Sequence, residues 1–149
     1  RGLNSLFLTE HFDPYEIHWQ LSKTGYVHFS TSPTGVVELK ENNRRFYSEK
    51  FWTPADSGKW FFLAVTAEQG TGKIQNYING KPITVVDGTQ RHKVIKKFRI
   101  GKCDLGNWSK PIWQNSIRSL NGRIDEFGIF SAVMSEDEIA GIYKIGKPN

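Results

Sequence analysis

Four side chains able to take part in acid–base chemistry fall at even spacing in two neighbouring segments. His18 and Gln20 are separated by one residue, and so are Tyr26 and His28. Because alternate side chains of a β-strand point to the same face, each pair would share one face of its strand. A Tyr/His pair with Gln, Asn or Arg nearby could perform the proton transfer of a polysaccharide lyase. The alternative, which we favour, is a set of polar residues on an exposed sheet face.

The carboxylates do not form the pair that a retaining glycosidase needs, with about 5–5.5 Å between the two groups. On one strand that pair requires acidic residues four positions apart, and no E-x-D-x-E or E-x-D-x-x-E sequence occurs. Asp125 and Glu126 are adjacent, so they would point to opposite faces of a strand. H-x-x-H, H-E-x-x-H and G-x-S-x-G patterns are also absent. The sequence therefore predicts no catalytic residues, and we expect that the chain is not an enzyme.

The residues best suited to bind a sugar lie in the turn-rich segment 104–118. Sugar recognition uses aromatic rings against the apolar sugar faces and planar polar groups for the hydroxyls. A loop of this length in a β-rich domain is commonly functional. The predicted ligand-binding residues are Trp113, Trp108, Asn107, Gln114, Asn115 and Arg118, joined from the other side by His18 and Gln20.

Short apolar or alternating runs separated by turn residues dominate the chain, which is typical of an antiparallel β-sandwich. The clearest reversal is Asn79-Gly80, the preferred pair of a type I′ hairpin turn. Trp60 is expected in the core. The predicted strands are residues 5–9, 16–21, 26–30, 36–39, 60–67, 73–78, 83–86, 98–100 and 123–130.

One segment near the C-terminus predicts a helix. Ser135 and Glu138 have the spacing of a capping box, with acidic residues in the first turn. Ile139, Ile142 and Tyr143 then fall on one face, and Gly146 ends the pattern.

Four motifs, in the same order, resemble those of bacterial laminin-G-like domains in the concanavalin A-like lectin/glucanase superfamily. Residues 58–65 resemble the W-x-x-x-A-V/T strand, and residues 73–80 resemble the Y-I-N-G-K hairpin. Residues 98–101 with 106–108 resemble the I-G-N-W segment, in which Trp108 could serve packing, so that Trp113 is the better sugar platform. Residues 121–130 with 134–143 resemble the closing motif, G-x-I-D-E followed by S-x-x-E-I and Tyr.

The resemblance implies an all-β, two-sheet antiparallel jelly roll with one short C-terminal helix, as a single domain over residues 1–149. It implies a structural calcium ion, with Asp125 at the matching position, although an ion pair of Asp125 with a nearby Arg or Lys is the alternative. Such domains usually begin with further strands. We therefore expect an incomplete sandwich, in which the edge of strand 123–130 is completed by another chain or by more of a longer protein.

The amino-acid composition limits the classes of molecule that this chain is expected to bind. The 20 Lys and Arg residues exceed the 15 Asp and Glu residues, which gives a net charge of +5. The densest basic segment, residues 91–99, could contact phosphates, but a solvated sheet edge explains it and we expect no nucleic acid partner. No apolar run reaches the roughly 18 residues that cross a membrane. Cys103 is the single cysteine, so an internal disulfide is impossible.

These observations favour a non-catalytic module that binds a polysaccharide or glycan, within a larger extracytoplasmic bacterial protein. A module that binds another protein, or serves as a structural spacer, is the first alternative. A polysaccharide-degrading enzyme of the same fold is the second.

Overall fold

The computed structural model describes residues 3–9, 16–31, 44–68, 71, 73–83, 100–107 and 118–146. Its strands are β1 (Leu3–Thr9), β2 (Ile17–Ser22), β3 (Val27–Thr31), β4 (Arg44–Tyr47), β5 (Leu63–Ala67), β6 (Ile74–Ile78), β7 (Lys81–Ile83) and β8 (Cys103–Leu105). A 3₁₀-helix, η1 (Pro54–Asp56), precedes β5, and one α-helix, α1 (Glu136–Gly146), follows the strands. No helix in these described ranges is long and apolar enough to cross a membrane.

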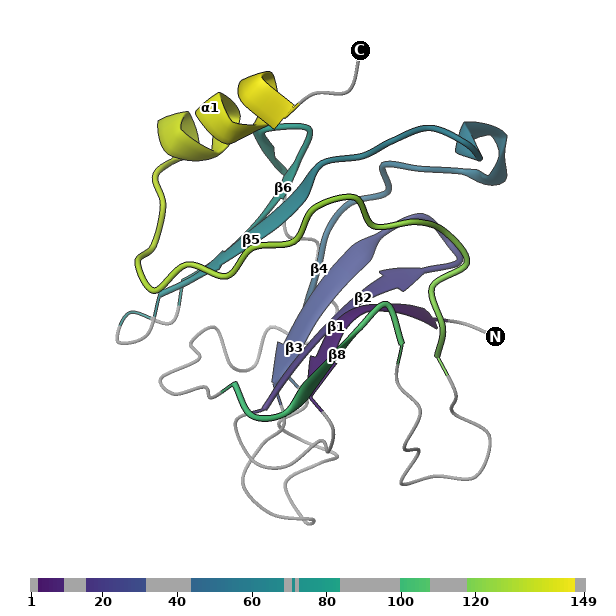
Figure 1. Cartoon of the computed structure of the whole chain (residues 1–149), viewed down its shortest axis with the longest axis horizontal. Coiled ribbons are helices and arrows are strands. Elements are labelled where there is room, and N and C mark those ends of the chain that lie inside the picture. The colour runs from purple at the N-terminus through teal and green to yellow at the C-terminus, as the bar shows by residue number, and fades with distance from the viewer. Residues whose placement is uncertain are drawn as a thin grey trace.

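The strands form two antiparallel sheets (Figure 1). The larger sheet has the order β4-β3-β2-β1-β8, and the smaller has the order β5-β6-β7. Figure 1 shows α1 beside the smaller sheet, at the end where β6 turns into β7. The predicted two-sheet sandwich with one C-terminal helix is confirmed.

The core lies between the two sheets. Phe7 pairs with Trp19 across β1 and β2, and Trp19 pairs with Phe29 across β2 and β3, so these rings share one face of the larger sheet. Phe7, Ile17, Phe29 and Ile74 form the buried cluster, and Trp19, Val65 and Ala67 pack against it. Because this cluster draws on both sheets, one face of the larger sheet is committed to the core.

The Asn79-Gly80 hairpin is confirmed. Asn79 has φ 51° and Gly80 has φ 76°, the two left-handed positions that a type I′ turn requires. Asn79 also holds the segment that leads into β5: its backbone N–H donates to the Phe62 carbonyl (2.8 Å), and its Oδ1 accepts from the Phe62 N–H (3.0 Å). Asn79 is therefore a structural turn residue.

The predicted capping box begins α1. Ser135 N–H donates to Glu138 Oε2 (2.7 Å), Ser135 Oγ donates to the same oxygen (2.8 Å), and Glu138 N–H donates to Ser135 Oγ (3.3 Å). The two donors of Ser135 stabilise the ionised carboxylate and lower the pKa of Glu138. Further along, the Tyr143 ring lies 5.8 Å from the Phe62 ring, which anchors the helix to the smaller sheet.

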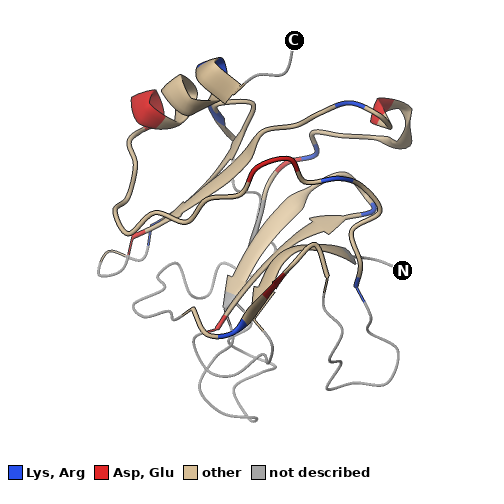
Figure 2. Ribbon diagram, in the orientation of Figure 1, with Lys and Arg blue, Asp and Glu red and all other residues tan. Residues whose placement is uncertain are grey.

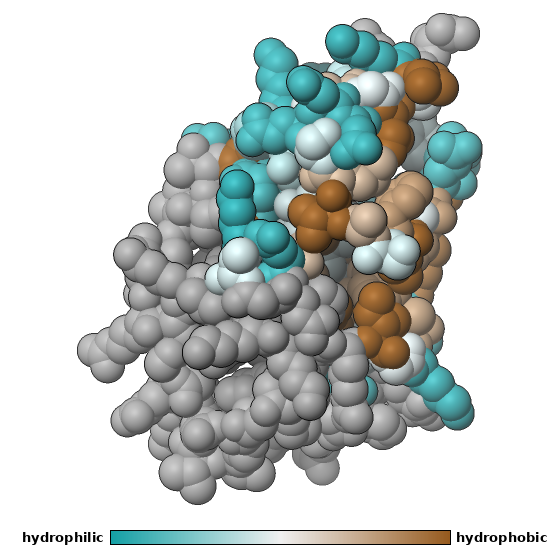
Figure 3. All heavy atoms as spheres, turned by 90° about the vertical axis from the view of Figure 1, so that its left-hand side faces the viewer, coloured by the Kyte–Doolittle hydropathy of each residue, from teal (hydrophilic) through white to brown (hydrophobic). Residues whose placement is uncertain are grey.

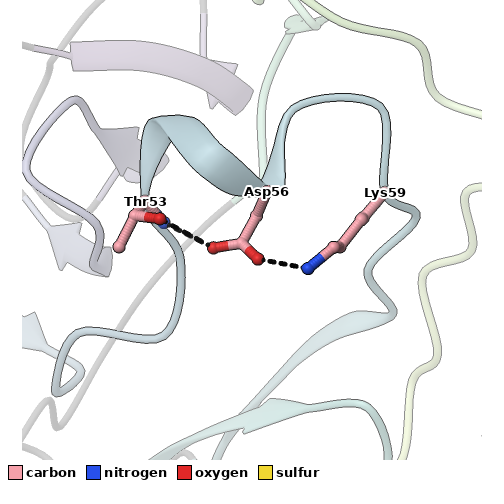
Figure 4. A network of polar contacts seen from close by, with 3 residues as sticks. All are labelled: Thr53, Asp56 and Lys59. Carbon is pink, nitrogen blue, oxygen red and sulfur yellow. Dashed lines mark hydrogen bonds and ion pairs between the residues drawn. The ribbon is translucent and has the colours of Figure 1, made fainter.

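A second cap, at η1, was not predicted. Asp56 Oδ2 accepts from the Thr53 N–H (2.9 Å) and the Thr53 hydroxyl (3.0 Å), and Asp56 Oδ1 accepts from Lys59 Nζ (2.7 Å), as Figure 4 shows. These donors lower the pKa of Asp56 from 3.8 to about 2, with Lys59 the largest cause. The local T-x-x-D spacing carried this signal in the sequence.

Two sequence predictions are wrong. Residues 123–130 form no strand in the described chain, although their alternation suggested one. Side-chain alternation favours an extended backbone, but a strand also needs a neighbour for its N–H and C=O groups, and no described segment provides it. Trp60 is half exposed, at 50%, because β5 begins only at Leu63 and the preceding residues run along the surface.

Other strands also differ from the sequence prediction. Strands β4 and β8 were not predicted, and Ile100 lies outside any strand. The expected strand 36–39 lies outside the described residues.

Candidate functional site

The second face of the larger sheet carries several polar side chains beside the buried Leu8, which pairs with His18. His18 pairs with Ser30, Gln20 pairs with His28, and Ser5 pairs with Gln20. Directly opposed residues of antiparallel strands project to the same face, so these five side chains form one surface, opposite the face with Trp19 and Phe29. We call these five residues the polar face. It combines His18 and Gln20, which the sequence singled out, with Ser5 and Ser30, which it did not.

The polar face is buried. The exposed fraction is 0% for Ser5, 3% for His18, 1% for Gln20, 2% for His28 and 4% for Ser30. The favoured interpretation of an exposed polar sheet face is therefore wrong. Alternation in the sequence predicts to which face of a strand a side chain points. It does not predict whether another part of the chain covers that face. Tyr26 lies one residue before β3, and its carbonyl accepts from the Ser22 N–H (2.7 Å).

Buried donors and acceptors normally have hydrogen-bond partners, so each buried polar group of this face is expected to have one. Ser30 Oγ donates to the His18 carbonyl (3.3 Å). Within the described residues, Gln20 Nε2 has no hydrogen-bond partner. A buried amide N–H left without a partner costs about 1–3 kcal/mol.

None of the five residues of the polar face carries a formal charge, but charged residues continue the same cross-strand row: Arg45 of β4 pairs with Ser30, and Asp104 of β8 pairs with Leu8, which pairs with His18. Strands β2 and β3 contain no Lys, Arg, Asp or Glu, and Figure 2 shows both as uncoloured ribbon between charged segments at the periphery. Hydroxyls, an amide and two imidazoles can both donate and accept hydrogen bonds. Because these groups are buried, they can hold neighbouring parts of the chain but do not form an accessible ligand surface.

The segment predicted to bind sugar begins and ends beside this face. The Leu120 N–H donates to the Gly106 carbonyl (2.8 Å), and Ser119 Oγ donates to Asn107 Oδ1 (3.1 Å). The Gly106 N–H donates in turn to the Leu6 carbonyl of β1 (2.9 Å). These bonds hold the two ends of segment 108–117 together next to β1; we call them the loop stem.

Ser5 connects the loop stem to the polar face. Its Oγ donates to the Arg118 carbonyl (2.7 Å), while Ser5 lies directly opposite Gln20 across β1 and β2. The structure thus places Asn107 and Arg118, both half-buried, close to the sheet position of Gln20. Sequence reasoning missed Ser5, because a single Ser in an apolar run gives no signal of its contact 113 residues away.

Four predicted site residues lie outside the described residues: Trp108, Trp113, Gln114 and Asn115. Asp125, the predicted calcium ligand, is exposed on segment 123–130. Within the described residues, no three Asp, Glu, His or Cys side chains come together as a metal site. Cys103 is an exposed free thiol on β8.

The sequence matches a family described as the concanavalin A-like lectin/glucanases superfamily over residues 10–140. The chain belongs to this superfamily. Its two antiparallel sheets and C-terminal helix agree with that membership. The name of the superfamily covers both lectins and glucanases, so membership leaves the function of this concanavalin A-like domain to be argued from its own residues.

No curated protein matches this concanavalin A-like domain. Among solved structures, it is similar to an S-layer domain-containing protein from Clostridium thermocellum, at 24% sequence identity and a TM-score of 0.36. The match covers 95% of this chain and 63% of the solved chain.

Proposed function

We propose that this concanavalin A-like domain is a non-catalytic module that binds carbohydrate, within an extracytoplasmic protein. The observation that supports the proposal is the Ser5–Arg118 hydrogen bond, which ties the end of the Trp-containing segment 108–117 to the buried polar face. In this arrangement the loop supplies the contact with the sugar, with Trp113 as the aromatic platform and Gln114 and Asn115 as hydroxyl partners. The buried polar face fixes the base of the loop.

Two features support a binding role over a catalytic one. The carboxylates of Asp125 and Glu126 are exposed and adjacent, so they do not flank a common bond. The pair His18 and His28 is buried on the polar face, where a polymer chain has no direct access. Incubation with β-glucans, galactans and uronans is expected to release neither reducing ends nor unsaturated products. Turnover that is lost in Glu126→Gln or His18→Asn would contradict the proposal.

Binding is tested on soluble polysaccharides by calorimetry and on a glycan array. We expect Trp113→Ala to weaken binding by about tenfold to a hundredfold, the loss expected for one aromatic hot spot. Trp60→Ala is the matched control: it removes an exposed Trp that lies far along the chain from the loop stem, and it should leave affinity unchanged. If the chain binds no glycan, or if Trp60 rather than Trp113 is required, the proposed site is wrong.

A further variant tests the loop stem. Ser5→Ala removes the hydroxyl that holds the Arg118 carbonyl and leaves the side chain small. We expect weaker glycan binding with the fold retained, because the loop loses one of its attachments to β1. Thr24→Ala serves as a control, since Thr24 is exposed in the β2–β3 turn.

A protein-binding role is the second candidate. It is favoured by one separate observation, the exposed apolar side chains of Phe127, Ile129 and Phe130, at 41%, 54% and 63%.

A further inference from the structure

The sequence contains the pair Asn-Gly twice, at residues 79–80 and at residues 121–122. An Asn side chain that precedes Gly can react with its own backbone, because Gly has no β-carbon to shield the next backbone nitrogen. As dipeptides the two pairs have the same reactive groups. Their surroundings in the structure differ, and these surroundings decide which pair can reach the reactive geometry.

The reaction is an intramolecular acyl transfer. The backbone nitrogen of Gly loses its proton and attacks the side-chain carbonyl carbon of Asn, a C–N bond forms, and the side-chain nitrogen leaves as ammonia. Water then opens the resulting cyclic imide. Opening at the side-chain carbonyl gives aspartate, and opening at the main-chain carbonyl gives isoaspartate, whose backbone is one carbon longer. The steps together consume one water and release one ammonia, and nothing is oxidised or reduced.

Asn79 is held away from this geometry. Its φ of 51° belongs to the left-handed turn, its N–H donates to the Phe62 carbonyl (2.8 Å), and its Oδ1 accepts from the Phe62 N–H (3.0 Å). Gly80 is buried, and a β-carbon there would lie 2.9 Å from Tyr143. The Asn79 side chain can turn onto the Gly80 nitrogen only if the hairpin opens locally, so its conversion must wait for that opening.

Asn121 is accessible to the reaction. Asn121 and Gly122 are both exposed, and they form a bend outside any helix or strand. Within the described part of the chain, no hydrogen bond fixes the Asn121 side chain. Gly122 does not share the left-handed φ of Gly80, and a β-carbon on it would meet only the Leu120 side chain, at 3.6 Å or more. The Asn121 side chain can therefore turn onto the Gly122 nitrogen without opening a hairpin.

The bend at Asn121 lies between two anchors of the chain. On one side the Leu120 N–H donates to the Gly106 carbonyl (2.8 Å), and on the other the Phe127 ring stacks on Phe7 at 5.4 Å. Isoaspartate at position 121 would add one backbone carbon between these anchors. The extra length must be taken up by the bend or by displacement of one of the two contacts.

A displacement on the Phe127 side would change the exposed apolar surface. Ile129, Phe130 and Val133 follow Phe127 and are exposed. Figure 3 shows apolar atoms gathered on the side of the molecule below α1, whose own surface is polar. Conversion at one exposed bend would therefore alter a part of the molecule that is suited to contact other molecules.

We propose that Asn121 is a site of spontaneous deamidation to aspartate and isoaspartate, that the fold protects Asn79 from the same reaction, and that isoaspartate at position 121 loosens the segment that follows. The inference is independent of the glycan proposal, since the reaction requires no ligand.

Peptide mapping by mass spectrometry on protein aged at neutral pH tests the selectivity, with aspartate and isoaspartate peptides separated by chromatography. Asn121 should accumulate both products. Asn79 should convert at least about tenfold more slowly, because hydrogen bonds of the hairpin must break first. In guanidinium chloride the two sites should convert at similar rates, because only the fold distinguishes them.

Gly122→Ala separates the chemistry from the structure. Its β-carbon shields the attacking nitrogen and fits beside Leu120, so conversion of Asn121 should slow strongly with the fold retained. Gly141→Ala is the matched control: it makes the same change on α1, where a β-carbon meets nothing within 4 Å, and it should leave the rate at Asn121 unchanged.

Melting temperatures test the effect on the segment. The purified isoaspartate form should melt below Asn121→Asp, which carries the same charge without the extra backbone carbon, and equal values would overturn this effect. Asn121 that stays intact in the folded chain while it converts in guanidinium chloride would overturn the assignment of the site. So would equal rates at Asn79 and Asn121 in the folded chain, or a wild-type rate in Gly122→Ala.

Discussion

Gly80, in the β6–β7 turn, lies directly against Tyr143 of α1. A β-carbon at Gly80 would lie 2.9 Å from both Cβ and Cδ1 of Tyr143, closer than carbon atoms normally approach. The same turn carries Asn79, which is bonded to Phe62, and the Phe62 ring packs on Tyr143. Hairpin, strand β5 and helix therefore meet at one point, which depends on the absence of a side chain at position 80.

Gly80→Ala is expected to destabilise the domain. The left-handed φ of 76° costs a residue with a side chain about 1–2 kcal/mol, and displacement of Tyr143 adds to this. Gly141→Ala is the matched control on α1: a β-carbon there meets nothing within 4 Å. Removing a helical Gly should stabilise the domain by about 0.5–1 kcal/mol. Thermal unfolding measures both, and equal melting temperatures for the two variants would show that the contact is unimportant.

Asn76→Val is expected to stabilise the domain. Asn76 is 0% exposed on β6, and within the described chain neither polar atom of its amide has a hydrogen-bond partner. Its cross-strand neighbours are Val65 and Ile83, so Val fits an apolar position in a strand. A buried amide without partners costs about 1–3 kcal/mol, and Val should recover part of it in urea unfolding.

The adjacent residue provides the control for that substitution. Gln75 Nε2 donates to the Asn76 carbonyl (2.9 Å) and the Ile83 carbonyl (2.8 Å), so Gln75→Val should destabilise where Asn76→Val stabilises. If Asn76→Val lowers the free energy of unfolding by more than about 1 kcal/mol, the Asn76 side-chain amide makes a stabilising hydrogen bond and this prediction is wrong.

The cap at η1 is expected to weaken only in strong acid. The Lys59 and Thr53 donors favour the ionised form of Asp56 and lower its pKa from 3.8 to about 2. A lowered folded-state pKa means that the contribution is complete above pH 3.8 and is lost as pH falls through about 2. The Asp56 carboxyl carbon should titrate near the lower value by NMR, and Lys59→Met should raise the midpoint. An unshifted midpoint in the wild-type chain would contradict the cap.

A structural calcium ion at Asp125 stays a prediction. If it binds, EDTA should lower the melting temperature, millimolar Ca²⁺ should restore it, and Asp125→Asn should abolish the response, because ligand binding stabilises the folded state by mass action. A melting temperature unchanged by EDTA and by Ca²⁺ would show that no such site exists.

The sequence alone determined the features that depend on short-range hydrogen bonds. Ser135 and Glu138 predicted the start of α1, and Asn79-Gly80 predicted the hairpin, because each motif satisfies its own backbone groups within a few residues. Alternation likewise placed His18 and Gln20 together on one strand face. These signals survive in any tertiary context that allows the element to form.

Tertiary structure decided what covers each face and which strands find neighbours. The alternation at residues 17–21 is the same whether the polar face is buried or exposed, so its burial could not be predicted. Residues 123–130 alternate as a strand does, yet no described part of the chain forms backbone hydrogen bonds with them. Trp60 has the hydrophobicity of a core residue but lies before the first paired residue of β5. Burial and pairing are properties of the neighbours that long-range folding brings together, and a local pattern carries no information about them.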